Sequence, residues 1–135
     1  MSKIILTDAT ITVNSVALSS LANSVTLNYE MDSIEITAFG DAGHKFTGGL
    51  QNNSVEMELF QDFAATLTEV TIYPLVGSPT TVVLKPTSAA TSVTNPTYTL
   101  SNTTLTAHTP IAGGVGEVGM TSLSFAGGTL VKTTV

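Results

Sequence analysis

Val25-Thr26-Leu27-Asn28-Tyr29-Glu30-Met31 and, further along, Val55-Glu56-Met57-Glu58-Leu59 are the stretches that decide the fold. In both, apolar side chains alternate with polar ones, and this repeat of two residues is typical of a β-strand with one buried face. Thr10–Val13, Asn14-Ser15 and Val16–Leu18 predict a hairpin with a two-residue turn. Further strands are predicted over residues 34–37, 81–85, 98–100, 104–108, 121–125 and 129–133.

The remaining segments predict one helix and two loops within a single domain, residues 1–135. Thr66-Leu67-Thr68-Glu69 matches a capping box with Thr66 as N-cap, and Pro74 and Gly77 would end the helix. A strand over the β-branched run 70–72 is the alternative. Residues 39–53 are Gly-rich and residues 109–119 are Pro- and Gly-rich, so both are predicted to be loops. We therefore expect an all-β fold, a sandwich or partial barrel, with one short helix.

The composition indicates a surface that meets other protein subunits rather than nucleic acid. Only 10% of the residues are charged, against about 25% in typical soluble domains. So few charges protect poorly against association. The chain has four lysines, no arginine and a formal net charge of −6. Because arginine is the usual ligand of phosphates and guanine edges, its absence disfavours a protein that grips nucleic acid, but not one that lets it pass.

The motifs of an enzyme or a cofactor-binding protein are missing or incomplete. Residues 114–119 match G-x-G-x-x-G, but a predicted strand follows where a dinucleotide site needs a helix. His44 and His108, the two histidines, lack partners at the spacing of a triad or metal site. The chain has no cysteine, and the apolar run at residues 4–6 is too short for a signal peptide or membrane anchor. We expect no catalytic, cofactor-binding or metal-binding residue.

Glutamates gather on the polar side of the predicted strands. If the strands are regular and adjacent, Glu30, Glu35, Glu56 and Glu58 share the face opposite the apolar residues. One interpretation is an ordinary solvated surface. The other is a wall that repels an anion: DNA carries one charge per about 1.7 Å of axis, so a conduit for it benefits from like-charged walls within about 8–10 Å.

The chain resembles, over nearly its whole length, the major tail tube proteins of siphophages, especially those that infect actinobacteria. Each of several elements is similar to that family, and the ordered set makes the likeness. The elements are Val13-Asn14-Ser15-Val16-Ala17-Leu18-Ser19, Ser24-Val25-Thr26-Leu27, Phe39-Gly40-Asp41, Leu59-Phe60-Gln61-Asp62-Phe63-Ala64, Tyr73-Pro74-Leu75-Val76-Gly77, Asn95-Pro96-Thr97-Tyr98-Thr99 and Met120-Thr121-Ser122-Leu123-Ser124-Phe125. Relatives commonly have Gly at the position of Ser15 and more charge.

The resemblance implies a structural virion protein of the phage tail, assembled in the host cytoplasm, without a cofactor. Hexameric rings would stack into a tube, each subunit lending four strands to a shared inner barrel through which DNA passes without specific binding. Its partners would be other copies, the tail terminator, the baseplate or tip, and the tape measure protein. On this basis we predict that Glu30, Glu35, Glu56 and Glu58 line the lumen. We also predict that residues 39–53 reach a neighbouring subunit or ring, with contacts from Phe39, Asp41, His44, Lys45, Phe46 and Leu50.

Two alternatives remain open. One keeps the fold but assigns the chain to a tail terminator or connector ring, or to a non-phage injection tube. The other, from a different class, is a β-sandwich module for carbohydrate binding or adhesion. Such a module predicts clustered exposed aromatic side chains, whereas this chain has no Trp and is only 6% aromatic.

Overall fold

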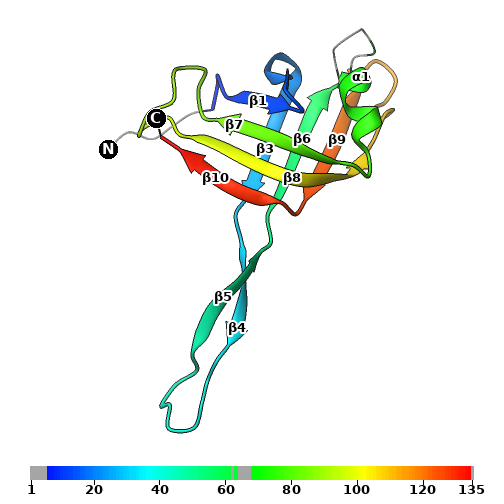
Figure 1. Cartoon of the computed structure of the whole chain (residues 1–135). Coiled ribbons are helices and arrows are strands. Elements are labelled where there is room, and N and C mark those ends of the chain that lie inside the picture. The colour runs from blue at the N-terminus through cyan, green and yellow to red at the C-terminus, as the bar shows by residue number, and fades with distance from the viewer. Residues whose placement is uncertain (1–5, 62, 64–67, 135) are drawn as a thin grey trace.

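The computed structural model describes residues 6–61, 63 and 68–134. It consists of a β-sheet body from which a long hairpin projects (Figure 1). The strands are β1 Thr10–Val13, β2 Val16–Ala17, β3 Ala22–Asn28, β4 Met31–Glu35, β5 Phe46–Gln51, β6 Ser54–Phe60, β7 Pro79–Lys85, β8 Thr97–His108, β9 Met120–Ala126 and β10 Thr129–Thr133. The helical elements are η1 Ser19–Leu21, α1 Thr68–Ile72 and η2 Tyr73–Leu75. The all-β expectation with one short α-helix is confirmed.

The body is one antiparallel sheet folded over on itself into an open sandwich. Its strands follow the order β2-β1-β7-β8-β9-β6-β3, and β10 pairs with β8 outside this path. The path starts at β2 and ends at β3, so the described strands do not close into a barrel. Among the described residues, no strand pairs with the second edge of β3, and such an edge is a template for pairing with another strand.

The sheet turns its corner where β9 passes into β10. Both strands run along the same edge of β8, with Ala126 opposite Thr104 and Thr129 opposite Ser101. Gly128 lies between them with φ of +92°, and a Cβ there would come within 2.5 Å of the Ser101 carbonyl oxygen. Glycine is thus required for both backbone conformation and space. This corner separates the β3-β6-β9 half of the sheet from the half that contains β10.

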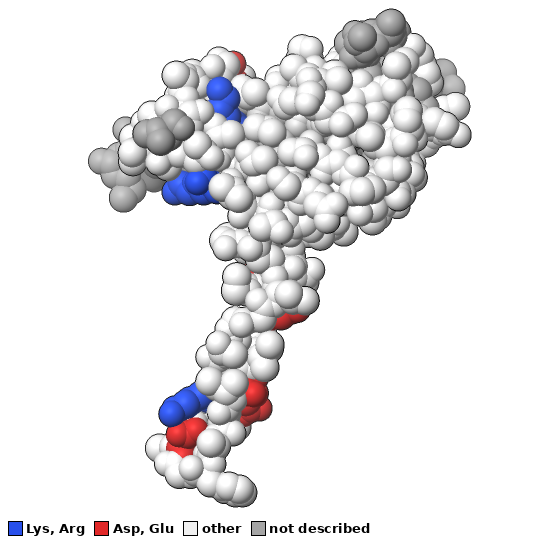
Figure 2. All heavy atoms as spheres, viewed as in Figure 1, with Lys and Arg blue, Asp and Glu red and all other residues white. Residues whose placement is uncertain are grey.

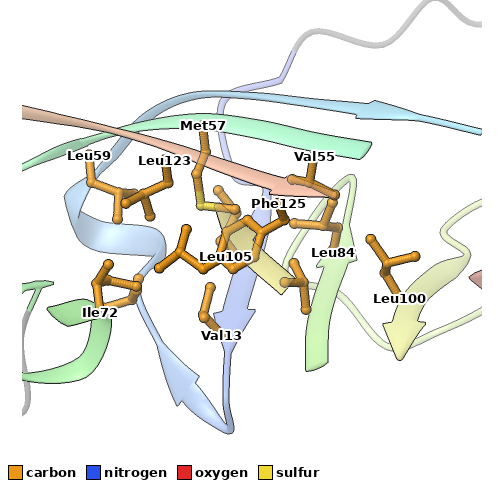
Figure 3. Close-up of a cluster of buried hydrophobic side chains, with 13 residues drawn as sticks. Val13, Val55, Met57, Leu59, Ile72, Leu84, Leu100, Leu105, Leu123 and Phe125 are labelled. Atoms are coloured by element: carbon orange, nitrogen blue, oxygen red, sulfur yellow. The ribbon is translucent and has the colours of Figure 1, made fainter. Parts of the chain in front are cut away.

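The core lies between the two halves of the sheet (Figure 3). Phe125 on β9 is 1% exposed and sits among side chains from several strands, with Val55 and Leu105 as its cross-strand neighbours. Ile72 of α1 is fully buried against the same cluster. The alternating residues of β6 and β9 point inward here, as their repeat of two predicts.

The β4–β5 hairpin continues the β3–β6 hairpin away from the body (Figure 1). Asn28 pairs with Ser54 and Met31 pairs with Gln51, so the same register runs across the junction. We call residues 29–52 the arm. The prediction of a loop over residues 39–53 was therefore wrong for residues 46–51, which form β5. The physical reason is that Gly48 and Gly49 leave room for the side chains of Met31 and Ile34 on the opposite strand.

Local features of the sequence have mixed outcomes. The two-residue turn at Asn14-Ser15 is confirmed, with φ of +51° and +68° between paired Val13 and Val16. The predicted N-cap Thr66 lies outside the described residues, whereas α1 itself is present over Thr68–Ile72. No helix among the described residues has both the length and the apolar character to cross a membrane. Residues 109–119 contain no strand or helix.

Candidate assembly and lumen surfaces

A polar face covers the outer side of strands β3, β6 and β9. The register aligns Thr26, Glu56 and Ser124 in one row across the three strands. It aligns Ser24, Glu58 and Ser122 in the next row. These six side chains line a shallow hollow of about 380 Å³, and its lining contains no lysine or histidine. Two carboxylates and four hydroxyls therefore form an acidic, uncompensated surface.

The structure brings together only two of the four glutamates predicted to share this face. Glu56 and Glu58 lie two residues apart on β6 and point to the same side. Glu30 lies between β3 and β4, at the root of the arm, and Glu35 lies on β4 within it. The alternation of side chains holds only along a continuous strand, and the chain leaves β3 after Asn28. The expectation of a four-glutamate face is thus reduced to a two-glutamate face.

The arm is the most exposed apolar part of the described chain. Every residue from Asn28 to Gly40 is exposed. Phe39, Phe46 and Leu50, which the sequence placed at a subunit contact, are 109%, 60% and 80% exposed. The other large apolar side chains exposed on the arm are Tyr29, Met31, Ile34 and Ile36. A two-stranded hairpin is only marginally stable in water by itself. These exposed side chains are therefore available to pack against another surface.

Two side-chain contacts shape the end of the arm. His44 Nδ1 and Glu35 Oε2 lie 2.6 Å apart, and the His44 ring also lies beside Phe46. Lys45 Nζ and Asp41 Oδ1 lie 2.8 Å apart, while the Ala38 N–H donates to the other carboxylate oxygen at 2.8 Å. The Lys45 ammonium, and after it this backbone N–H, lower the pKa of Asp41 below its ordinary value. The tip is therefore ordered by Asp41 in its ionised form.

Asn53 fixes the root of the arm to the body. Its side chain is 1% exposed. The Oδ1 atom accepts from the Glu30 N–H at 3.3 Å, and Nδ2 donates to Gln51 Oε1 at 2.8 Å and to the Gly128 carbonyl at 3.2 Å. Gln51 Oε1 also accepts from the Leu130 N–H at 3.1 Å. One buried amide thus links both strands of the arm to the corner between β9 and β10.

Replacing Asn53 by Ala is expected to destabilise the fold by about 1–3 kcal/mol, because it leaves buried polar partners unsatisfied. Chemical denaturation of the full chain measures this loss. The matched control is Asn52→Ala, since the Asn52 side chain is exposed and its backbone N–H donates to the Glu30 carbonyl within the arm. Equal stability losses in the two variants would contradict the role given to Asn53.

Asn53 does not stand out in the sequence. It lies in an Asn-Asn pair, one residue before an alternating strand, and asparagine is common in turns at such positions. Its importance comes from Gly128, which is 75 positions away in the chain. No local pattern carries that contact.

The described residues do not assemble a metal centre. No group of three or more potential ligands occurs among them. His108 Nδ1 lies 2.9 Å from Thr121 Oγ1, partly buried between β8 and β9. The glycines at 114–119 lie in a turn, with Glu117 accepting from the Gly114 N–H at 3.3 Å, and β9 follows directly.

The open sandwich with a polar sheet face and a projecting arm defines a tail-tube-like fold. Solved structures share it at low sequence identity. A chain of the PVC extracellular contractile injection system, in its sheath–tube complex in the extended state, matches with a TM-score of 0.71 at 14% identity, over 98% of this chain and 93% of that one. A chain of the same system's sheath/tube terminator matches with a TM-score of 0.73 at 15% identity, over 98% of both chains.

A third structure extends the likeness to another kind of particle. A chain of the virion of a native gene transfer agent matches with a TM-score of 0.72 at 13% identity, over 93% of this chain and 95% of that one. No family model matches the sequence, and no curated protein is similar to it. At these identities the shared feature is the fold.

Proposed function

We propose that this protein is a structural subunit of a tail tube, which assembles with copies of itself into stacked hexameric rings and forms a conduit for DNA. The observation that carries the proposal is the combination of an acidic sheet face with an exposed apolar arm on this fold. One surface suits a bore, and the other suits a contact between subunits. The fold shared with injection-system and gene-transfer-agent particles supports a structural role.

The open sheet supports closure between subunits. Strands β3, β6, β9 and the second half of β8 form a four-stranded piece whose outer side is the polar face. Four strands from each of six subunits, spaced about 4.8 Å apart and tilted about 40°, give a barrel with a backbone diameter of about 48 Å. A DNA duplex fits within that diameter. The free edge of β3 would be paired by this closure, which removes an aggregation hazard.

The acidic face would keep DNA moving. Glu56 and Glu58 would place two carboxylates per subunit, or twelve per six-membered ring, along the bore. Phosphates repelled by this wall form no lasting contacts, whereas lysines or arginines there would release counterions and hold the DNA. The repulsion acts within about one Debye length, roughly 8–10 Å. Glu30 and Glu35 remain proposed lumen residues only if the arm itself borders the bore.

The sequence resemblance bears on which type of tail the tube belongs to. It favours the major tail tube protein of a siphophage, located in the virion tail, with the terminator, the baseplate or tip, and the tape measure protein as partners. A terminator ring is the second candidate, because the match to a chain of a terminator structure is as good as the match to one of a sheath–tube complex. Homogeneous long tubes formed by the purified chain favour the first.

The lumen assignment is tested by reversing two charges. The double variant Glu56→Lys plus Glu58→Lys is expected to assemble and to bind linear double-stranded DNA at least tenfold more tightly than wild type at low salt. DNA binding is measured by co-sedimentation with the assembled tubes. The control Asp8→Lys plus Glu117→Lys makes the same charge change away from the polar face. An equal gain in both variants, or no gain in either, would refute the lumen role.

A further inference from the structure

A second apolar surface lies on the body, apart from the polar face. There a groove of about 490 Å³ lies between β3 and the strands β7, β8 and β10. Its walls include Val25, Leu27, Leu84, Tyr98 and Leu130, and Tyr29 at the arm root also borders it. The groove is thus an open part of the sandwich, where the apolar interior meets solvent.

Two lysines lie at this groove. Lys85 borders it and donates from Nζ to the Ala89 carbonyl at 3.1 Å. Lys132 is exposed, lies opposite Tyr98 in the β8–β10 pair, and shares the groove-facing side of β10 with Leu130, two residues before it. No carboxylate of the described residues lies within ion-pair distance of either lysine. Figure 2 shows lysine atoms on the body.

The arm has the complementary surface. It contains four carboxylates, Glu30, Asp32, Glu35 and Asp41, and one lysine, a formal charge of −4 + 1 = −3. Carboxylate atoms gather along it in Figure 2. It also exposes seven large apolar side chains. An apolar groove beside two lysines that have no carboxylate partner among the described residues fits an apolar, acidic partner, and the arm combines both properties.

The arm of one subunit leads away from its own body, so it does not fill its own groove (Figure 1). Arm and groove are therefore different, complementary surfaces of one chain. Such a contact between copies is heterologous, and repeated contacts of this kind generate closed rings or helical stacks. This is the type of symmetry that a tube requires.

We propose that the groove receives the arm of a second copy, whose apolar side chains fill it while Lys85 and Lys132 face the arm carboxylates. This inference rests on the proposed function, since it specifies the contact by which copies assemble. Burial of exposed apolar side chains supplies the attraction. The opposed charges set orientation and speed of docking more than affinity.

Photo-crosslinking of the full chain tests the contact. A photoreactive phenylalanine analogue at position 39 or 46 replaces an exposed aromatic side chain by another. After irradiation of assembled protein and chymotryptic digestion, mass spectrometry is expected to find arm peptides joined to peptides containing Lys85, Tyr98 or Leu130. The control places the analogue at Ser122 on the polar face. Tubes that crosslink from the arm only to other regions, including the N-terminal segment, would overturn the proposal.

A charge-reversal cycle gives an independent measurement. Lys85→Glu plus Lys132→Glu is expected to raise the protein concentration needed for assembly at least tenfold, and adding Glu30→Lys plus Asp32→Lys is expected to restore it to within about threefold. Unchanged assembly of the first variant, or no recovery in the second, would overturn the groove contact. If wild-type protein forms no rings or tubes, the proposed function fails. If wild type forms tubes without arm–groove crosslinks, only this inference fails.

Discussion

A chain in which Asn-Gly replaces residues 32–50 is expected to fold but to lose tube assembly completely. Met31 and Gln51 are paired in the arm, so a two-residue Asn-Gly turn can join them. The deletion removes five of the exposed large apolar side chains and retains the Gln51 and Asn53 contacts to the body. Because the removed part is exposed, we expect the free energy of unfolding to change by about 1 kcal/mol or less.

Negative-stain microscopy and thermal unfolding together measure this result. The matched control is Thr47→Ser, which keeps the arm and its register with Ile34. We expect the control to form tubes at the wild-type concentration. Normal tubes from the shortened chain would show that the arm is not an assembly element. An unfolded shortened chain would show that the arm is instead part of the core.

Replacing Phe125 by Ala is expected to destabilise the body by about 3–5 kcal/mol, and so to prevent assembly at 37 °C. Phe125 is 1% exposed and lies at the centre of the core (Figure 3). Its loss leaves a cavity between Val55 and Leu105, its cross-strand neighbours. Denaturant unfolding monitored by circular dichroism measures the change.

The control for this substitution is Ser124→Ala, one residue earlier on β9. Its side chain points to the polar face, so we expect a change of about 0.5 kcal/mol or less. A similar loss in both variants would mean that the two faces of β9 are not distinguished as buried and exposed. That result would remove the basis for placing Glu56 on an outer surface.

The repeat of two residues was enough to locate most of the sheet. It identified the interior-facing residues of β6 and β9. Only one face of these strands is buried, so apolar and polar residues alternate along them. It split β8 into two predicted strands, since Asn102 and Thr103 interrupt the apolar pattern. In the structure Asn102 adopts a φ of +58° and the strand continues through it. Asparagine tolerates this conformation better than most residues.

Residues 39–53, which include the second strand of the arm, were predicted as a loop because glycine normally weakens a strand. Here the glycines make room for side chains of the opposite strand. A Cβ at Gly48 would lie 2.7 Å from the sulfur of Met31, and one at Gly49 would lie 2.8 Å from Cδ1 of Ile34. A single sequence cannot distinguish a glycine that bends the chain from one that accommodates a neighbour. A related limit explains why the four glutamates do not share one face. The alternation of side chains along β3 does not continue into the arm.

Cryo-electron microscopy of the assembled protein tests the central claim most directly. We predict hollow hexameric rings in which Glu56 and Glu58 of every subunit point into the bore. Rings whose bore is lined by another face of the sheet, or a protein that stays monomeric at high concentration, would contradict it.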